Sequence, residues 1–162
     1  MKNKIKEVSE LKNIVKDYQQ KNKKVVFTNG CFDLLHIGHI RYLYRAKEFG
    51  SILVVALNSD KSVRNLKGEK RPIINEKERA EILAALEMID YITVFDDLTC
   101  KNILKTLKPD IYVKGGDYTR QTLPEWPVVT EYGGEVKLVK EIEGQSTTSL
   151  IGKIASIYND NN

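Results

Sequence analysis

The sequence predicts an α/β fold of the doubly wound type, in which a five-stranded parallel sheet carries helices on both faces. Short apolar stretches alternate with helical patterns of about ten residues, as right-handed β–α–β crossovers require. The stretch 51–58 (SILVVALN) is apolar on both faces, which is typical of a central parallel strand. With 162 residues, 41% of them hydrophobic, the chain has the profile of one domain, expected to cover 1–162.

The first half of the chain predicts an amphipathic helix followed by the first two strands. Apolar residues recur at three- and four-residue steps through 1–22, which predicts an N-terminal helix packed on the domain. The pattern then predicts a strand at 25–27, a loop with an Asn29–Gly30 turn, a helix from Gly38 to Phe49 and a strand at 51–58. Between Lys61 and Arg71 five cations accompany a single acidic residue without apolar periodicity, which predicts a mobile basic loop.

The second half of the chain continues the alternation. Asn75 and Glu78 have the spacing of a capping box, which predicts a helix that carries apolar residues as far as Ile89. The pattern then predicts strands at 91–95, 110–114 and 135–140, and helices at 99–107, 125–132 and 147–158. The tail 159–162 is expected to be disordered.

Charge, hydropathy and cysteine count argue against several classes of protein. The net charge is +4, but residues 1–24 alone carry +5, so no basic stripe for nucleic acid is expected on the main body. No apolar run approaches the ~20 residues that span a bilayer, and the first residues are charged, which predicts a cytoplasmic protein without membrane insertion. Cys31 and Cys100 lack a paired spacing, so neither a disulfide framework nor a zinc site is predicted.

The chain's two histidines, His36 and His39, lie together where the first crossover helix begins. The loop 28–33 connects the preceding strand to them, and its candidate ligand-binding residues are Thr28, Asn29, Gly30, Cys31 and Phe32. The free backbone amides of a helix start attract an anion, and Gly38 lets a phosphate approach the backbone closely. The alternative is a pair of ordinary helix-start histidines. Position after a strand of a parallel sheet favours a phosphate site.

Two further segments are expected at the same edge of the sheet. Residues 144–149 bring four hydroxyl groups to the start of the last helix, and Ser146, Thr147 and Thr148 are candidate phosphate ligands as well as helix caps. Gly115 and Gly116 follow the fourth strand, where backbone atoms can contact a base or ribose. Asp117 is a candidate ligand contact there, and Lys114 is a weaker one.

Taken in this order, the motif at 29–39 and the Ser-Thr run resemble the H-x-G-H nucleotidyltransferase superfamily, whose fold is Rossmann-like. Within it the chain is most similar to the stand-alone heptose 1-phosphate adenylyltransferases that make ADP-heptose. The likeness covers about 24–155. It rests on the segments 58–64, 66–68, 71–72, 78–86, 113–118 and 133–136, together with the two motifs.

The resemblance implies roles for these residues. His36 and His39 would hold the nucleotide phosphates and steady the transition state, while the Ser-Thr run flanks the triphosphate. Lys67 and Arg79 match basic positions that the family brings to the reacting phosphates. The superfamily often has an arginine shortly after the Ser-Thr run, where this chain has Leu150 and Ile151, so the cation for the β and γ phosphates stays open between Lys153 and others.

The expected reaction is transfer of AMP from ATP to a heptose 1-phosphate, with in-line attack on the α-phosphorus and no covalent intermediate. Mg²⁺ is expected with ATP, bound mainly through phosphate oxygens, with Asp33 as a candidate indirect partner and no protein metal site. The resemblance further implies a homo-oligomer (dimer or tetramer) and a separate upstream heptose kinase. The sugar anomer and the role of Trp126 stay open.

Two alternative functions remain at this point. A cytidylyltransferase acting on glycerol 3-phosphate or another small phosphate would use the same motifs, because phosphate-binding groups do not choose the base. The segments 114–117 and 123–125 favour adenine and heptose. A non-enzymatic nucleotide sensor or RNA-binding module is the second alternative, since a similar helix start occurs in class I aminoacyl-tRNA synthetases. Their Lys-rich second signature is absent here.

Overall fold

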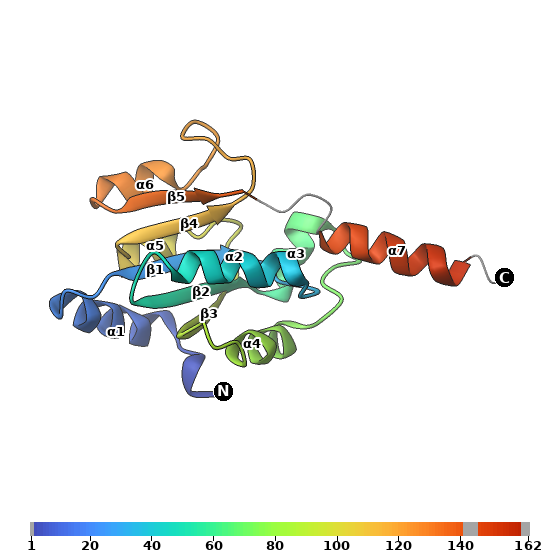
Figure 1. The fold of residues 1–162 in the computed structure, drawn as a ribbon, viewed down its shortest axis with the longest axis horizontal. Coiled ribbons are helices and arrows are strands. Elements are labelled where there is room, and N and C mark those ends of the chain that lie inside the picture. The colour runs from blue at the N-terminus through green and yellow to red at the C-terminus, as the bar shows by residue number, and fades with distance from the viewer. Residues whose placement is uncertain (1, 141–145, 160–162) are drawn as a thin grey trace.

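A computed structural model describes residues 2–140 and 146–159, and its centre is one five-stranded parallel sheet (Figure 1). The strands are β1 (Val25–Gly30), β2 (Ile52–Asn58), β3 (Tyr91–Phe95), β4 (Ile111–Gly115) and β5 (Glu135–Val139). Their order is β3-β2-β1-β4-β5, and every neighbouring pair is parallel. The chain therefore runs outward from β1 to one edge and then, from β4, to the other. This confirms the predicted doubly wound, Rossmann-like fold and puts its topological switch point between β1 and β4.

Helices cover both faces of this sheet, as predicted. The helices α1 (Val8–Gln20), α5 (Lys101–Leu107) and α6 (Trp126–Glu131) pack on one face, and α2 (Ile37–Lys47) and α4 (Glu76–Ala84) on the other. Successive residues of a strand point to opposite faces, so Val54 joins the first core cluster and Val55 the second. The last helix, α7 (Thr147–Asn159), extends away from the sheet in Figure 1.

The predicted mobile loop at 61–71 is wrong over most of its length. Helix α3 spans Asp60–Lys67, and the Ser59 hydroxyl caps it by accepting the Ser62 amide at 3.2 Å. Val63 of this helix is fully buried. The sequence pattern did not predict this helix because only Val63 and Leu66 are apolar in this segment, which is too few for a periodic pattern. Residues 68–71 remain a loop, in which Gly68 has a φ of +95°.

The N-terminal and C-terminal segments also differ from expectation in detail. A short 3₁₀ turn, η1 (Lys2–Lys4), precedes α1, and Ile5 between them forms a parallel bridge with Ile92. Asn159 belongs to α7, although the sequence predicted it in a disordered tail; residues 160–162 lie outside the described residues. Among the described helices, none combines the length and the apolar character that a membrane crossing requires.

Candidate functional site

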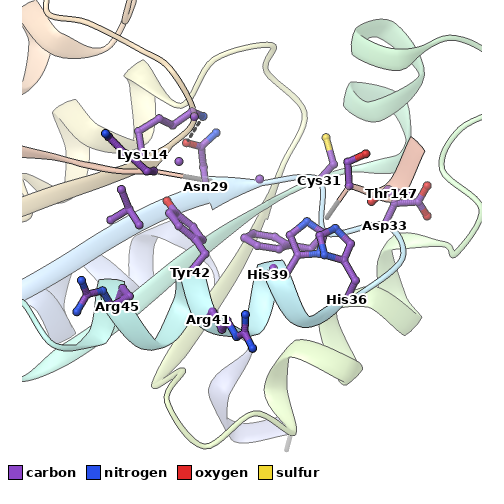
Figure 2. Close-up of a pocket in the computed structure, with 18 of the residues that line it drawn as sticks. Asn29, Cys31, Asp33, His36, His39, Arg41, Tyr42, Arg45, Lys114 and Thr147 are labelled. Atoms are coloured by element: carbon purple, nitrogen blue, oxygen red, sulfur yellow. Dashed lines mark hydrogen bonds between the residues drawn. The ribbon is translucent and has the colours of Figure 1, made fainter. Parts of the chain in front are cut away.

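A cavity of about 1140 Å³ opens at the carboxyl edge of the sheet, beside the switch point between β1 and β4 (Figure 2). Its wall includes three segments that are far apart in the sequence: the β1–α2 connection, the end of β4 and the start of α7. Most of the predicted site residues line it: Asn29, Gly30, Cys31, Phe32, His36, Gly38, His39, Lys67, Gly115, Gly116, Ser146, Thr147 and Thr148. Gly144 and Gln145, at the start of the predicted hydroxyl segment, lie outside the described residues.

The two histidines stack on each other at the start of α2. His36 is the N-cap residue, with extended backbone (φ −137°, ψ 170°), and the ring centroids of His36 and His39 are 3.9 Å apart. Phe32 packs edge-on against His39 at 5.3 Å. Burial and the neighbouring His36 lower the pKa of His39 to about 4, against an opposing backbone hydrogen bond with Leu34. His39 is therefore neutral near pH 7 and can donate an N–H to an anion.

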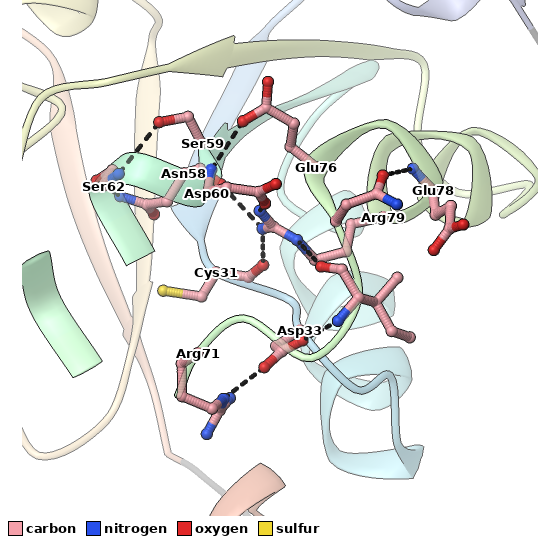
Figure 3. A network of polar contacts seen from close by, with 12 residues as sticks. Cys31, Asp33, Asn58, Ser59, Asp60, Ser62, Arg71, Glu76, Glu78 and Arg79 are labelled. Carbon is pink, nitrogen blue, oxygen red and sulfur yellow. Dashed lines mark hydrogen bonds and ion pairs between the residues drawn. The ribbon is translucent and has the colours of Figure 1, made fainter. Parts of the chain in front are cut away.

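Asp33 fixes the basic segment that follows α3. Its carboxylate accepts hydrogen bonds from Arg71 Nε at 2.5 Å and from the Ile73 and Ile74 amides at 2.8 and 2.9 Å (Figure 3). Burial raises the pKa of Asp33, but the two amides and Arg71 outweigh it and hold this pKa below its usual value. Asp33 is thus an ionised anchor for Arg71, which lines the cavity. Over the described ranges, no three His, Cys, Asp or Glu side chains lie close enough to hold a metal ion.

Arg79 lies beneath the cavity wall and not among the lining residues. The residue is 1% exposed, and its side chain donates to the carbonyl oxygens of Ile74, Cys31 and Asn58 at 2.8, 2.5 and 2.9 Å. It also forms an ion pair with Asp60 at 2.7 Å (Figure 3). The guanidinium therefore joins the ends of β1 and β2 to the segment before α4, a position that favours a structural role.

Thr28 and Asp117 also lie outside the lining set. Thr28 is buried, and its hydroxyl is 2.6 Å from the Tyr42 hydroxyl, which donates to the Val113 carbonyl at 3.0 Å. Tyr42 thereby connects β1 to β4 under the cavity, and a Cβ at Gly115 would come within 3.1 Å of its ring. Asp117 is exposed.

Sequence reasoning did not assign several residues of α2 to the site. Arg41, Tyr42, Tyr44 and Arg45 line the cavity together with His39. The available signal was helical spacing, because Tyr42 and Arg45 follow His39 at successive three-residue steps and so share its face of the helix.

The chain also resembles known proteins over most of its length. Residues 27–157 match the profile of the cytidylyltransferase-like family. The bifunctional protein HldE of Geobacter metallireducens is 54% identical over 157 residues, which are 97% of this chain and 32% of that protein. HldE of Geobacter sulfurreducens is 52% identical over the same shares of the two chains. The chain thus spans about a third of the length of these curated relatives.

A solved structure resembles the fold as well. The crystal structure of the lipopolysaccharide core biosynthesis protein from Thermoplasma volcanium superposes with a TM-score of 0.62 at 29% identity. The superposition covers 76% of this chain and 99% of that one. The family profile extends from β1 into α7, and residues of the predicted motifs within this span line one cavity. The chain therefore belongs to the cytidylyltransferase-like family of nucleotidyltransferases.

Proposed function

We propose that this chain transfers AMP from ATP to a heptose 1-phosphate, forming ADP-heptose and pyrophosphate. The observation that carries the proposal is one cavity in which two imidazoles, a helix start, three hydroxyl residues and several cations, Lys67 and Arg71 among them, meet. Identity of about 50% to HldE proteins, which are bifunctional by name, supports this choice of reaction. The solved structure of a lipopolysaccharide core biosynthesis protein supports a sugar substrate.

The proposed chemistry is an in-line displacement at the α-phosphorus. An oxygen of the sugar 1-phosphate forms a new bond to that phosphorus, while the bond to the bridging oxygen breaks and pyrophosphate leaves with the electron pair. The nucleophile is already an anion, so the chain needs no general base. Its task is to align the two substrates and to donate hydrogen bonds to the charge that develops on the phosphoryl oxygens. Neutral His39, the amides that begin α2 and the hydroxyls of 146–148 are suited to that task.

Two cations of the site come from the end of α3 and the segment after it. Lys67 is the last residue of α3, and Arg71 is held by Asp33. Both line the cavity beside the histidines and would neutralise the β and γ phosphates. The residues of the site fit a Mg²⁺ ion that arrives with ATP. The Asp33 carboxylate already accepts hydrogen bonds from Arg71 and two backbone amides, so phosphate oxygens would supply most of the ligands of the ion. Such an ion would add further charge neutralisation at the triphosphate.

A pyrophosphate-release assay tests the proposal. The chain would be supplied with ATP, CTP or GTP, each combined with heptose 1-phosphate (both anomers), glycerol 3-phosphate or another small phosphate. Release is expected with ATP and heptose 1-phosphate. Preference for CTP and glycerol 3-phosphate would replace the proposal by the cytidylyltransferase alternative, and nucleotide binding without release under any combination would favour a sensor.

Replacing His39 tests the assigned role of the motif. His39→Ala removes a donor to the transition state, and loss of one such donor costs about 3 kcal/mol, or roughly a hundred-fold in kcat. Full pyrophosphate release by this variant would remove His39 from the mechanism.

Three expectations stay predictions. Light scattering would check the homo-oligomer, a genomic search would check the separate upstream kinase, and cell fractionation would check the cytoplasmic location.

A further inference from the structure

A row of hydrogen bonds leads from the buried core to the cavity wall at Asn29. The Cys100 thiol donates to the Tyr112 hydroxyl at 3.7 Å, and Tyr112 Oη donates to Asn29 Oδ1 at 2.8 Å. Lys114 Nζ donates to the same Asn29 oxygen at 3.1 Å (Figure 2). Asn29 and Lys114 line the cavity, whereas Cys100 and Tyr112 are fully buried behind it. The row belongs to the face of the sheet opposite Tyr42, because Thr28 and Asn29 are successive residues of β1.

This row fixes which way the Asn29 amide faces. An ammonium group has no acceptor, so the atom that faces Lys114 must be the amide oxygen. Burial raises the pKa of Cys100 to about 12 and that of Tyr112 well above its usual value. Both groups keep their protons near neutral pH, and the thiol supplies its proton to Tyr112, so the Tyr112 proton is directed at Asn29. The amide oxygen thus takes two donors, and neither of these contacts uses the amide nitrogen.

The amide nitrogen is then the unused hydrogen-bonding group of Asn29. Within 2–140 and 146–159, no protein acceptor takes a hydrogen bond from it, and the residue is part of the cavity wall. The neighbouring Lys114 ammonium also lies 5.8 Å above the Tyr118 ring, a cation–π distance, which restrains it further. This part of the wall therefore presents donors to a ligand.

We propose that Tyr112 is a positioning residue that holds the Asn29 amide so that its NH₂ group donates to an oxygen of a substrate in the cavity. The inference rests on the proposed nucleotidyl transfer, and it names the chemistry of the partner: a phosphate or hydroxyl oxygen. Either the nucleotide or the acceptor sugar phosphate can supply that oxygen. Tyr112 itself touches no substrate and acts through Asn29.

The variant Asn29→Asp tests the donor role directly. Aspartate keeps an oxygen for Tyr112 and Lys114 but puts a second oxygen where the NH₂ group was. The KM of whichever substrate supplies the oxygen should rise about ten-fold or more, and more than in Asn29→Ala, because the lost bond is joined by repulsion between oxygens. A rise for ATP alone assigns the oxygen to the nucleotide, and a rise for the sugar phosphate alone assigns it to the acceptor. Wild-type KM values for both substrates in Asn29→Asp would overturn the proposal.

The variant Tyr112→Phe tests the positioning role in a double-mutant cycle. It removes the hydroxyl that holds Asn29, and it should raise the same KM several-fold in the native chain but hardly at all in Asn29→Ala. Tyr42→Phe is the matched control, since it also removes a hydroxyl that joins β1 to β4, and its effect should be the same in both backgrounds. An effect of Tyr112→Phe that is equal in both backgrounds would show a merely structural residue and refute positioning.

The design separates this inference from the proposed function. The wild-type chain is first assayed with each nucleotide and acceptor, and the variants are then measured with the pair it uses. If the wild-type chain uses CTP, the proposed reaction is wrong. The KM values of the Asn29 variants, measured with CTP, would still show whether the amide donates to a substrate. Thermal melting of each variant accompanies the kinetics. Should Tyr112→Phe fail to fold, Asn29→Asp alone still decides whether the amide donates to a substrate.

Discussion

Replacing Arg79 by alanine should destabilise the fold by about 3–5 kcal/mol, the range for breaking a buried charged pair. The resemblance assigns Arg79 to the reacting phosphates, whereas the structure shows it buried and bonded to backbone carbonyls. A phosphate-binding role and a structural role predict different results for this variant. If Arg79 contacts phosphates, the variant folds normally and loses turnover. If its contacts are those of the structure, the free energy of unfolding falls first, and activity falls because the cavity wall loses its support.

The magnitude follows from the four hydrogen bonds of the guanidinium. Arg79 is 1% exposed, and without its side chain the carbonyl oxygens of Cys31 and Asn58 lose a buried donor. An unsatisfied buried polar group costs about 1–3 kcal/mol. The Asp60 carboxylate is 24% exposed, so water can partly replace the arginine there and this contribution is smaller. The two carbonyls together give about 2–6 kcal/mol, which brackets the expected range and is a large share of a typical domain's stability.

Urea denaturation followed by circular dichroism measures this loss. Arg64→Ala is the matched control, because Arg64 is an exposed arginine of α3 and its removal should change stability by no more than about 0.5 kcal/mol. If Arg79→Ala unfolded at the wild-type urea concentration while pyrophosphate release was lost, the structural reasoning would be wrong. The catalytic assignment would then stand.

Three further predictions concern pH, packing and charge. The pKa of His39 is about 4 in the fold and about 6.5 in the unfolded chain, so unfolding takes up a proton between these pH values and the free energy of unfolding falls as pH falls from 6.5 to 4. His39→Asn should weaken this fall, measured as the urea midpoint at each pH. The same dependence of the midpoint on pH in the variant and the wild type would contradict the prediction. Gly50→Ala should cost about 1–3 kcal/mol in urea denaturation, since its Cβ would lie 2.7 Å from the Lys24 carbonyl; an unchanged midpoint would count against this packing. Arg71→Ala should raise the KM for the triphosphate at least ten-fold, whereas Lys153→Ala, exposed on α7 and outside the cavity lining, should not; the reverse order would move the phosphate cation to α7.

The structure brings the predicted motifs to one edge of the sheet, and this could be expected because it depends on the topology of the sheet alone. In a parallel sheet every strand ends at the same edge, so the loop at 28–33 and the glycine pair had to meet once the alternation of strands and helices was correct. His36 and His39 lie together at the start of the first crossover helix, as predicted: His36 is the cap residue of α2, and its ring stacks on that of His39.

Other parts of the site depend on contacts that a linear pattern does not contain. Tyr42 contacts Val113 because the register of β1 and β4 pairs Thr28 with Val113. Tyr112 reaches Asn29 for the same reason, on the opposite face. Apolar periodicity marks such tyrosines only as core residues, and nothing in the sequence tells which hydroxyl reaches the cavity wall. The burial of Arg79 was likewise invisible, because a charged residue on a helix is ordinarily read as exposed.

Buried charges set the position of the groups that face the cavity. Asp33, 2% exposed, holds Arg71 and the amides of Ile73 and Ile74, so the segment after α3 is tied to the β1–α2 connection. Arg79 ties that connection to β2 through the Cys31 and Asn58 carbonyls. Asp33 and Arg79 therefore both hold the β1–α2 connection in place. A triphosphate would then meet donors and cations that are already in place, and its binding energy would not be spent on ordering them.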